Sequence, residues 1–283
     1  MTEPSLEGRI EECTRRWSVT VDERRDTVDS VLLLGRRGDA HVVLKVVRRR
    51  TDEWESGAIL SAFAGSASVL ALEVTGGAVL LERLLPGSAL ASLSLSGRDD
   101  EATGILADVI DRMRPLEPPA VAVPVEDLAR GFDRYLAGTD RRIDGRLVDN
   151  AHRIYLSLCR TQSRPRLLHG DLHHYNVLFD DCRGWTAIDP KGYVGELEYE
   201  LGASLRNPYE QPAVFSGLDA VNRRLALLAQ ALPVNQDRAL AWAYAQAVLA
   251  VIWSVEDGTA VEAVDPCLTL ARAIEPVLAV RDT

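Results

Sequence analysis

Hydrophobic and polar positions alternate through the first third of the chain, which is the pattern of half-buried strands. Strands are expected at residues 17–21, 31–34, 41–47, 69–74 and 78–81. The last four pair across turns at residues 35–40 and 76–77. An amphipathic helix is expected before them at 5–16 and another between them at 51–63, while 22–29 reads as a charged loop.

Beyond residue 87 the hydrophobic period changes to that of amphipathic helices. Helices are expected at residues 99–113, 125–137, 147–159, 218–232, 236–255 and 266–280. The segment ERLLPG at 82–87 separates the two patterns, so we expect it to connect two lobes. The chain of 283 residues is long enough for both. The pattern predicts an α+β protein with a sheet-bearing N-terminal lobe, 1–85, and a mostly helical C-terminal lobe, 86–283.

One stretch of the C-terminal lobe, LLHGDLHHYNVLFDDCRGWTAID at 167–189, carries the candidate chemistry. Two apolar runs around the turn DDCRG predict a β-hairpin. A hairpin would bring Asp189 beside Asn176. Asn176 itself follows Asp171 by five residues. A carboxylate and an amide oxygen suit Mg²⁺ that carries phosphates. The expected chemistry is phosphoryl transfer, in which Asp171 orients a hydroxyl and accepts its proton while Asn176 and Asp189 hold Mg²⁺.

Two other interpretations of this stretch were weighed. His169, His173 and His174 lie near Asp171, but their spacing is not that of a zinc site and no cysteine pair accompanies them. The hairpin could also be an ordinary polar surface feature. For catalysis, we expect His169 to fix the loop through hydrogen bonds. His173 either approaches the transferring phosphoryl group or is a hydrogen-bonded loop residue.

Composition and charge limit the class of protein. Apolar residues make up 47% and charged residues 26%, which is ordinary for a soluble domain. We see no apolar run long enough to span a bilayer, no signal peptide and no paired cysteines, so a cytoplasmic protein is expected. The net charge of −10 argues against binding to nucleic acid or anionic membranes. Oligomeric state is left open between a monomer and a weak dimer.

The excess acid lies in the C-terminal lobe. Residues 86–283 carry 28 acidic against 20 basic side chains, whereas residues 1–85 carry 14 against 12. This distribution would favour a cationic small-molecule substrate. Acidic surfaces also keep proteins soluble, which explains the excess equally simply.

Lysine is rare in this chain, since Lys45 and Lys191 are the only two among 32 basic residues. Lys45 lies within a predicted strand, where it is either an edge residue or a ligand for the α- and β-phosphates of ATP. In the second case a helix glutamate pairs with it, and we prefer Glu55 over Glu53. Lys191 follows Asp189 closely and is expected to reach the phosphate or the acceptor, the alternative being a solvent-exposed lysine.

A nucleotide bound to Lys45 would extend toward the connector at 82–87. Its adenine ring would then meet backbone groups from Glu82 to Leu84, between apolar walls. ATP and Mg²⁺ are thus the expected cofactors.

From about Trp17 to its C-terminus the chain resembles the aminoglycoside phosphotransferase branch of the protein-kinase-like fold. Within it, the resemblance is to the streptomycin 6-kinase and hydroxyurea phosphotransferase group. It is carried by VVLKVV at 42–47, LLERLLPG at 80–87, LLHGDLHHYNVLF at 167–179, AIDPKGYVGE at 187–196 and LRNP at 205–208. The resemblance implies an ATP-dependent small-molecule O-phosphotransferase that confers antibiotic resistance.

Three features depart from that family's usual pattern. The segment 22–30, where a nucleotide loop belongs, has no glycine, and no residue in it is assigned. Glu200 replaces an aspartate that supports the catalytic loop. Tyr175 precedes Asn176 and is expected to narrow the acceptor side.

The acceptor site is expected where the C-terminal helices face the catalytic loop. Trp253, Glu256 and Asp257 can share one helix face, which suits a guanidinium-bearing cyclitol such as streptomycin. Glu196 and Glu198 are expected on the other side of the same pocket. A core tryptophan with two solvated acids is the simpler explanation. A metabolic alcohol, such as a sugar or an amino alcohol, remains an alternative acceptor, and so does a kinase-like binding protein without turnover.

Overall fold

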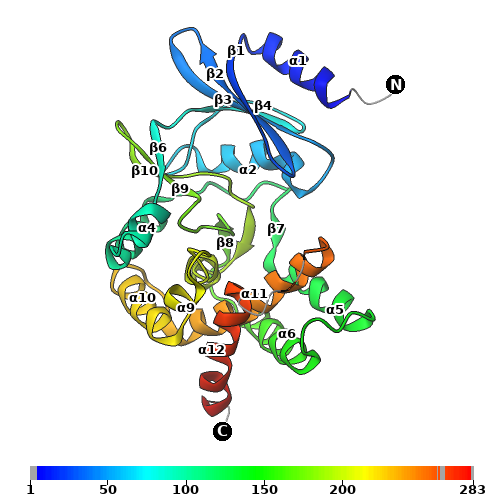
Figure 1. Cartoon of the computed structure of the whole chain (residues 1–283), viewed down its shortest axis with the longest axis vertical. Helices are drawn as coiled ribbons and strands as arrows, with labels where there is room; N and C mark the ends of the chain where they lie inside the picture. Colours follow the sequence, from blue (N-terminus) through cyan, green and yellow to red (C-terminus); the bar gives the residue numbers. More distant parts are fainter. Residues whose placement is uncertain (1–4, 260, 262–264, 282–283) are drawn as a thin grey trace.

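The protein has two lobes stacked along its longest axis, with the N-terminus on the upper lobe and the C-terminus at the far end of the lower one (Figure 1). The structure is a computed structural model that describes residues 5–259, 261 and 265–281. The upper lobe is an antiparallel sheet with two helices attached, and the lower lobe is mostly helical. The predicted α+β, kinase-like architecture is confirmed.

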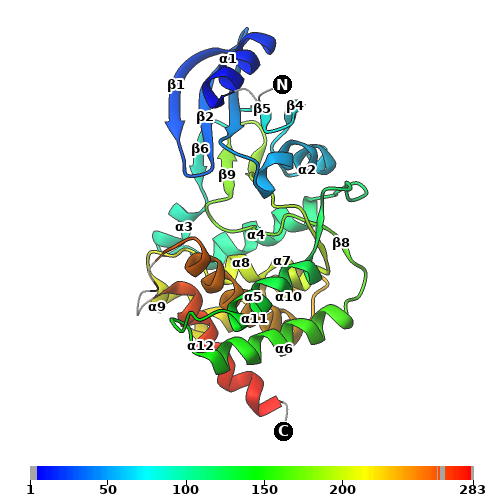
Figure 2. The ribbon, with the colours of Figure 1, turned by 90° about the vertical axis from the view of Figure 1, so that its right-hand side faces the viewer.

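The upper lobe contains a five-stranded sheet in the order β1-β2-β3-β5-β4. Its strands are β1 (Thr20–Asp26), β2 (Ser30–Arg37), β3 (Ala40–Val47), β4 (Ala71–Thr75) and β5 (Ala78–Glu82). Two helices accompany the sheet, α1 (Leu6–Arg16) and α2 (Ser56–Phe63), and α2 follows the short 3₁₀ turn η1 (Asp52–Glu55). Figure 2 shows α1 and α2 on different sides of the strands.

Alternation along β3 decides which side chains reach the space between the lobes. Val42, Leu44 and Val46 are fully buried in the core that includes Ile10 of α1. The intervening side chains point to the opposite face, because successive residues of a strand alternate. Lys45 is one of these, and it therefore faces the cleft.

The lower lobe is built around α11 (Gln236–Glu256). Its other long helices are α4 (Asp99–Arg112), α5 (Arg130–Ala137), α6 (Gly145–Arg160), α10 (Leu218–Ala231) and α12 (Pro266–Arg281). Each coincides with a predicted helix, although 125–137 is divided into a 3₁₀ turn, η2 (Val125–Ala129), followed by α5. Four short helices were not predicted, α3 (Ala91–Leu95), α7 (Leu197–Glu200), α8 (Gly202–Leu205) and α9 (Pro212–Phe215).

Helix α11 corrects one expectation, because by length and composition it is long and apolar enough to cross a membrane. Its most apolar window is 72% buried inside the protein. Residues 239–252 of this helix pack against neighbouring helices of the lobe. The apolar stretch is therefore accounted for as the core helix of a globular lobe.

Two small sheets hold the catalytic segment. Strands β9 (Val177–Asp180) and β10 (Gly184–Ala187) form the predicted hairpin, and β6 (Pro86–Ala89) pairs with β9. Strand β11 (Tyr193–Gly195) lies between β7 (Val123–Pro124) and β8 (Arg166–Leu168). The residues between these strands, 169–176 and 188–192, are consequently fixed at both ends.

The first strand was predicted wrongly. Instead of a strand at 17–21 and a charged loop at 22–29, β1 continues to Asp26 and pairs with β2. All seven residues of β1 are exposed, and Arg24 forms ion pairs with Glu7 and Asp26. An edge strand of this kind has no apolar face, so hydrophobic alternation cannot reveal it. The predicted turn at 35–40 likewise shrinks to Gly38 and Asp39, since β2 runs to Arg37.

Candidate active site

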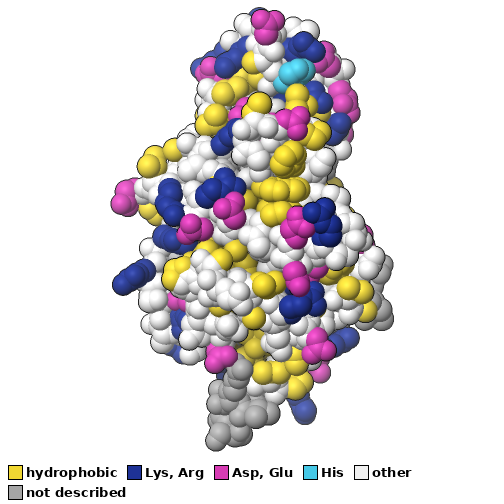
Figure 3. Space-filling model, turned by 90° about the vertical axis from the view of Figure 1, so that its left-hand side faces the viewer, with side chains coloured by type: hydrophobic (Ala, Val, Ile, Leu, Met, Phe, Trp, Pro, Cys, Tyr) yellow, Lys and Arg dark blue, Asp and Glu magenta, His cyan; other side chains and the backbone are white. Residues whose placement is uncertain are grey.

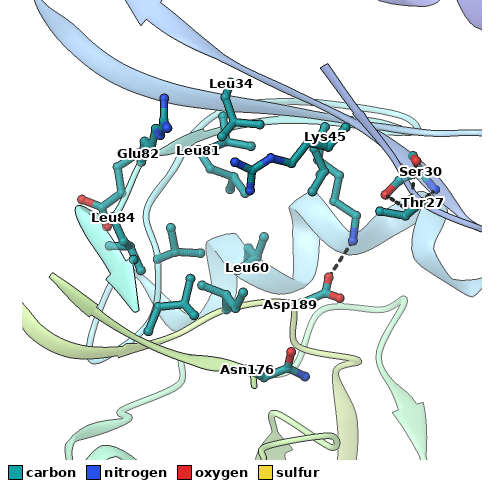
Figure 4. A pocket seen from close by; sticks show the side chains of 18 of the residues that line it. Thr27, Ser30, Leu34, Lys45, Leu60, Leu81, Glu82, Leu84, Asn176 and Asp189 are labelled. Atoms are coloured by element: carbon teal, nitrogen blue, oxygen red, sulfur yellow. Dashed lines mark hydrogen bonds and ion pairs between the residues drawn. The ribbon is translucent and has the colours of Figure 1, made fainter. Parts of the chain in front are cut away.

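A cavity of about 460 Å³ lies between the lobes (Figure 4). One end is lined by apolar side chains and the other carries Lys45, Asn176 and Asp189. The apolar lining comes from the sheet, from α2 and from the hairpin, through Leu34, Val43, Leu60, Leu81, Leu84, Leu178 and Ile188. Figure 3 shows that hydrophobic side chains also gather on the surface at the waist between the lobes, on the side bearing β6 and β10. The cavity therefore has room for a flat apolar ring at one end and charged groups at the other.

The connector offers a free backbone donor to this cavity. The N–H of Arg83 donates to His41 O over 3.1 Å and that of Leu85 to the Asp180 carboxylate over 2.8 Å. Within the described part of the chain, the N–H of Leu84 between them has no such acceptor. The Glu82 carboxylate instead accepts from Leu70 N (2.9 Å) and from Arg183, and the Glu82 N–H donates to Leu70 O over 3.1 Å, so the free N–H of this segment is that of Leu84.

Lys45 pairs with two carboxylates. Its Nζ lies 2.6 Å from Asp189 Oδ1 and 3.0 Å from Glu53 Oε2. Burial would lower the pKa of Lys45, but attraction to Asp189 and Glu53 outweighs burial and raises it. The preference for Glu55 was wrong. Glu55 forms the boundary between η1 and α2, and the 3₁₀ turn directs Glu53 toward the cleft.

Glu53 also binds the second lysine. Its Oε1 lies 2.8 Å from Lys191 Nζ, so one carboxylate bridges Lys45 and Lys191. Burial would raise the pKa of Glu53, yet the two ammonium groups hold it below its usual value. Lys191 is thus held by Glu53 rather than free in solvent, and its reach to a phosphate or an acceptor stays a prediction.

Asn176 and Asp189 lie on either side of the hairpin's open end and point into the same space (Figure 4). Asp189 adopts φ 59°, a strained backbone conformation for a residue other than glycine. Burial would raise the pKa of Asp189, but Lys45 and Lys191 lower it. The Asn176 amide N–H donates to Asp171 O over 3.0 Å, which leaves its carbonyl oxygen for another partner.

These two oxygen donors fit Mg²⁺ better than a transition metal. In the described chain there is no group of three or more His, Cys, Asp or Glu side chains that could hold a metal ion by themselves. The histidines do not converge, because His169 Nε2 binds Ile188 O (2.8 Å) and the ring of His174 is buried away from Asp171. Mg²⁺ needs few protein ligands when phosphates and water supply the rest.

Glu200 holds the loop that carries Asp171 through two backbone hydrogen bonds. Glu200 accepts from the backbone N–H groups of His169 (2.7 Å) and Gly170 (3.0 Å), which is the support anticipated for a residue at this position. Burial raises the pKa of Glu200 to about 7 against the effect of these donors. Burial likewise lowers the pKa of His169 to about 4, so its ring is neutral at physiological pH and fixes the loop to Ile188.

Asp171 itself lies between two side chains. Arg206 Nη2 is 3.5 Å from Oδ1, and His173 Nε2 is 3.7 Å from Oδ2. Burial lowers the pKa of His173. Tyr175 turns away from Asp171, since its hydroxyl donates to Glu210 and its ring stacks on Tyr209 at 4.8 Å.

A second cavity, of about 600 Å³, is lined by Asp171 and adjoins the first at Asp29 and Glu53, which line both. Three predicted acceptor residues, Trp253, Glu256 and Asp257, line it together with Asp171 and Lys191. The Glu256 carboxylate is already held by Arg134 through two contacts of 2.9 Å. The prediction that Trp253, Glu256 and Asp257 share a helix face therefore agrees with this cavity, but it did not anticipate the Arg134–Glu256 ion pair.

Two predicted acceptor residues lie elsewhere. Glu196 is fully buried and binds Trp242 Nε1 (2.5 Å), Ser163 N (3.1 Å) and Arg238. Glu198 accepts from the backbone N–H of Asn235, beyond either cavity. The prediction failed for both because β11 and α7 present Tyr193 and Tyr199 to the pocket, while Glu196 and Glu198 bind partners elsewhere.

The turn between β1 and β2 replaces a glycine-rich loop with hydroxyl contacts. The Thr27 hydroxyl accepts from Ser30 N over 3.0 Å and contacts the Ser30 hydroxyl at 3.1 Å. Both residues, with Asp29, line the cavity between the lobes (Figure 4). No sequence signal distinguished them, because the segment lacks the glycines by which such loops are recognised.

Comparison with solved structures places the fold. The choline kinase LicA from Streptococcus pneumoniae is 14% identical with a TM-score of 0.63, covering 97% of this chain and 99% of that one. An aminoglycoside phosphotransferase solved in ternary complex with ADP and hygromycin B is 15% identical with a TM-score of 0.63, covering 95% and 96%. At these identities the likeness shows a shared kinase-like fold.

Proteins related by sequence identify the family more specifically than the solved structures do. Streptomycin 3''-kinase of Klebsiella pneumoniae is 31% identical over 86% of this chain and 91% of its own length. Hydroxyurea phosphotransferase of Kitasatospora aureofaciens is 32% identical over 89% and 74%. Streptomycin 6-kinase of Streptomyces glaucescens is 29% identical over 95% and 89%. The family model described as aminoglycoside/hydroxyurea antibiotic resistance kinase matches residues 16–258. The chain therefore belongs to the aminoglycoside/hydroxyurea antibiotic resistance kinases, which are ATP-using small-molecule phosphotransferases.

Proposed function

We propose that this kinase transfers the γ-phosphoryl group of Mg²⁺-ATP to a hydroxyl of a cationic, guanidinium-bearing aminoglycoside of the streptomycin type. The observation that carries the proposal is the place of Asp171, which lines the second cavity and whose backbone carbonyl accepts from Asn176 of the first. One cavity has the apolar end, the lysine and the oxygen donors of a nucleotide site, and the other carries Trp253 and Asp257.

On the nucleotide side, each side chain has a role that follows from its contacts. The adenine ring would pack among the leucines and accept from the free N–H of Leu84. Lys45, oriented by Glu53, would bind the α- and β-phosphates, and Asn176 and Asp189 would hold Mg²⁺ through their free oxygens. Bound Mg²⁺ would offset the phosphate charge.

On the acceptor side, Asp171 would orient the hydroxyl in line with the γ-phosphate and take its proton late in the transfer. Lys191 is held within reach of that reaction by Glu53. His173 lies beside the Asp171 carboxylate as a hydrogen-bonded loop residue, since its Nδ1 accepts from Tyr175 N at 3.3 Å.

The dimensions and charges of the second cavity favour an aminoglycoside over hydroxyurea as the acceptor. A cavity of about 600 Å³ is in the range of sites for drug-sized ligands. Hydroxyurea would leave most of it filled with water. Asp257 and the Trp253 ring suit a guanidinium group, through paired hydrogen bonds and a cation–π contact.

The test is a panel of acceptors incubated with the wild-type enzyme, ATP and Mg²⁺, with products identified by mass spectrometry. Streptomycin should gain one phosphoryl group, hydroxyurea and choline should react at least about 100-fold more slowly in kcat/KM, and Asp171→Ala should give no product. Preferential phosphorylation of hydroxyurea or choline would overturn the acceptor assignment and leave the kinase assignment intact.

We further propose that the lobes divide at residues 85 and 86 and that a single chain is active, in the cytoplasm where ATP is available. The nucleotide-side and acceptor-side residues assigned above come together within one folded chain, which supports activity of a monomer. Size-exclusion chromatography with light scattering at assay concentration tests the oligomeric state.

A further inference from the structure

Arg206 lies beside the carboxylate of Asp171, and none of the roles assigned above uses it. Its side chain is only 14% exposed and lines the acceptor cavity, with Nη2 3.5 Å from Asp171 Oδ1. Burying a guanidinium is costly unless the charge is paired. The position of Arg206 therefore calls for a function connected with Asp171.

The backbone around Arg206 is fixed from behind by another arginine. Nη1 of the fully buried Arg224 donates to the carbonyls of Ser204 (3.2 Å) and Asn207 (2.8 Å), on either side of Arg206. Arg224 is itself held by Asp99, whose Oδ1 lies 2.6 Å from Nη2. A buried ion pair thus places the root of the Arg206 side chain against the catalytic loop.

The guanidinium of Arg206 is incompletely satisfied. Its Nη1 is buried and has no hydrogen-bond partner among the residues that the structure describes. The contact from Nη2 to Asp171 is long for a charge-assisted hydrogen bond and is single, although a guanidinium and a carboxylate can form two parallel bonds. Leaving a buried donor unsatisfied is unfavourable, which favours a partner in the working complex.

The two oxygens of Asp171 are consequently in different environments. Oδ1 faces the permanent positive charge of Arg206, and Oδ2 faces the neutral ring of His173 at 3.7 Å. A carboxylate held through Oδ1 has its rotation about χ2 restricted, so Oδ2 keeps one direction. Orientation of this kind is what a base needs when most of its effect comes from positioning a hydroxyl.

We propose that Arg206 is a positioning residue that clamps Asp171 through Oδ1 and closes to a two-bond contact when the acceptor enters, leaving Oδ2 for the acceptor hydroxyl. The inference rests on the proposed role of Asp171 and adds a constraint on the acceptor. Because the deep end of the cavity holds a fixed cation, the guanidinium groups of the acceptor bind at the Asp257 end, and an uncharged hydroxyl face enters toward Arg206.

The test uses slow ATP hydrolysis without any acceptor, in which water takes the acceptor's place. Arg206→Met should lower this rate about 30- to 100-fold, an effect within the range for mispositioned catalytic groups. Arg206→Lys should recover part of the rate, because lysine keeps the positive charge but lacks the paired N–H donors of a guanidinium. ADP affinity should stay within about threefold of wild type. Arg153→Met, on the exposed side of α6, is the control for loss of one positive charge.

A double-mutant cycle separates positioning from a general structural role. In an Asp171→Asn background, Arg206→Met should lower hydrolysis by less than about threefold, because Arg206 acts through the carboxylate already removed. An equal loss in both backgrounds would overturn the proposal, and so would wild-type hydrolysis in Arg206→Met. If Arg206→Met does not bind ADP, Arg206→Lys replaces it, and its hydrolysis rate is compared in the wild-type and Asp171→Asn backgrounds.

Streptomycin phosphorylation is measured separately with the same variants. If the wild type leaves streptomycin unmodified, the acceptor assignment fails while the hydrolysis data still decide the role of Arg206. If streptomycin is phosphorylated but Arg206→Met keeps the wild-type kcat and hydrolysis rate, the acceptor assignment stands and the Arg206 proposal is wrong.

Discussion

The two cavities adjoin at Asp29 and Glu53, which line both, and they differ in how they are built. The nucleotide cavity is lined by one sheet, its connector and one hairpin, so most of its residues fall in three continuous stretches. The acceptor cavity combines residues from the β1–β2 turn, the segment leading into η1, the catalytic loop, β11, α7, the end of α8 and α11. A site made of continuous stretches is constrained by local geometry. A site made of residues from many separate segments depends on how those segments pack.

Glu53 and Glu55 offer the sharpest contrast on the nucleotide side. Glu53→Gln should lower kcat/KM for ATP about 100-fold, since it leaves Lys45 and Lys191 without their shared carboxylate in a buried site. Glu55→Gln is the matched control and should stay within about twofold. Steady-state kinetics with varied ATP decides between them. A larger loss in the Glu55 variant would contradict the observed pairing.

Lys191 lines the second cavity and is held by Glu53, which lines both, so its removal tests whether the two cavities are coupled. Lys191→Met keeps the length of the side chain and should lower kcat about 10-fold, because an ammonium near the transferring phosphoryl group is lost. The KM for ATP should change less than kcat. Unchanged kinetics would mean that Lys191 is only a structural partner of Glu53.

On the acceptor side, Glu256 and Asp257 line the cavity, whereas Glu196 is buried outside it. Neutralising Glu256 and Asp257 together should raise the KM for streptomycin about 5- to 10-fold and leave the KM for ATP unchanged. Glu196→Gln should instead destabilise the fold by about 3 kcal/mol, since it breaks a buried ion pair with Arg238. Thermal unfolding and acceptor kinetics of both variants check this division. A rise in the ATP KM would contradict the placement of Glu256 and Asp257.

The smallest effect concerns Glu200, whose folded pKa of about 7 lies above the ordinary value of 4.5. Folding then binds a proton, so the contribution of Glu200 to stability is complete below pH 4.5 and is lost as pH rises through 7. The slope approaches about 1.4 kcal/mol per pH unit. The buried His169 and His174 act oppositely, because their lowered pKa values make stability fall as pH drops below 6.5.

The difference between wild type and Glu200→Gln isolates this carboxyl group from the histidines. Urea unfolding at pH 5, 6, 7 and 8 should show a wild-type stability that declines relative to the variant between pH 5 and 7. A constant difference across that range would show that Glu200 does not titrate there.

The sequence predicted the fold and the nucleotide side well, for identifiable reasons. The hairpin turn and the alternation along 177–188 placed Asn176 and Asp189 together, and the lack of other lysines drew attention to Lys45 and Lys191. Choosing between Glu53 and Glu55 required the direction of a 3₁₀ turn, which two residues of sequence do not specify. The charged edge strand β1 had no hydrophobic alternation to reveal it.

The acceptor side shows where local patterns are insufficient. Helical spacing placed Trp253, Glu256 and Asp257 on one face, and the structure brings that face to Asp171. Glu196 and Glu198 were misplaced because their positions depend on the turn after Lys191 and on partners in α11. Arg206 falls in the LRNP segment that carries the family resemblance, but no local pattern indicated a place beside Asp171, since its position results from the Asp99–Arg224 ion pair on distant helices.

The central claim is that Asp171 acts on the acceptor and Asp189 on the nucleotide. Calorimetric titration of a non-hydrolysable ATP analogue into Asp171→Ala and Asp189→Ala, with and without Mg²⁺, tests it directly. Both variants should lose turnover by at least about 1,000-fold. Asp171→Ala should bind the analogue within about threefold of wild type and keep its dependence on Mg²⁺, whereas Asp189→Ala should lose that dependence. Equal loss of nucleotide affinity in the two variants would contradict the account.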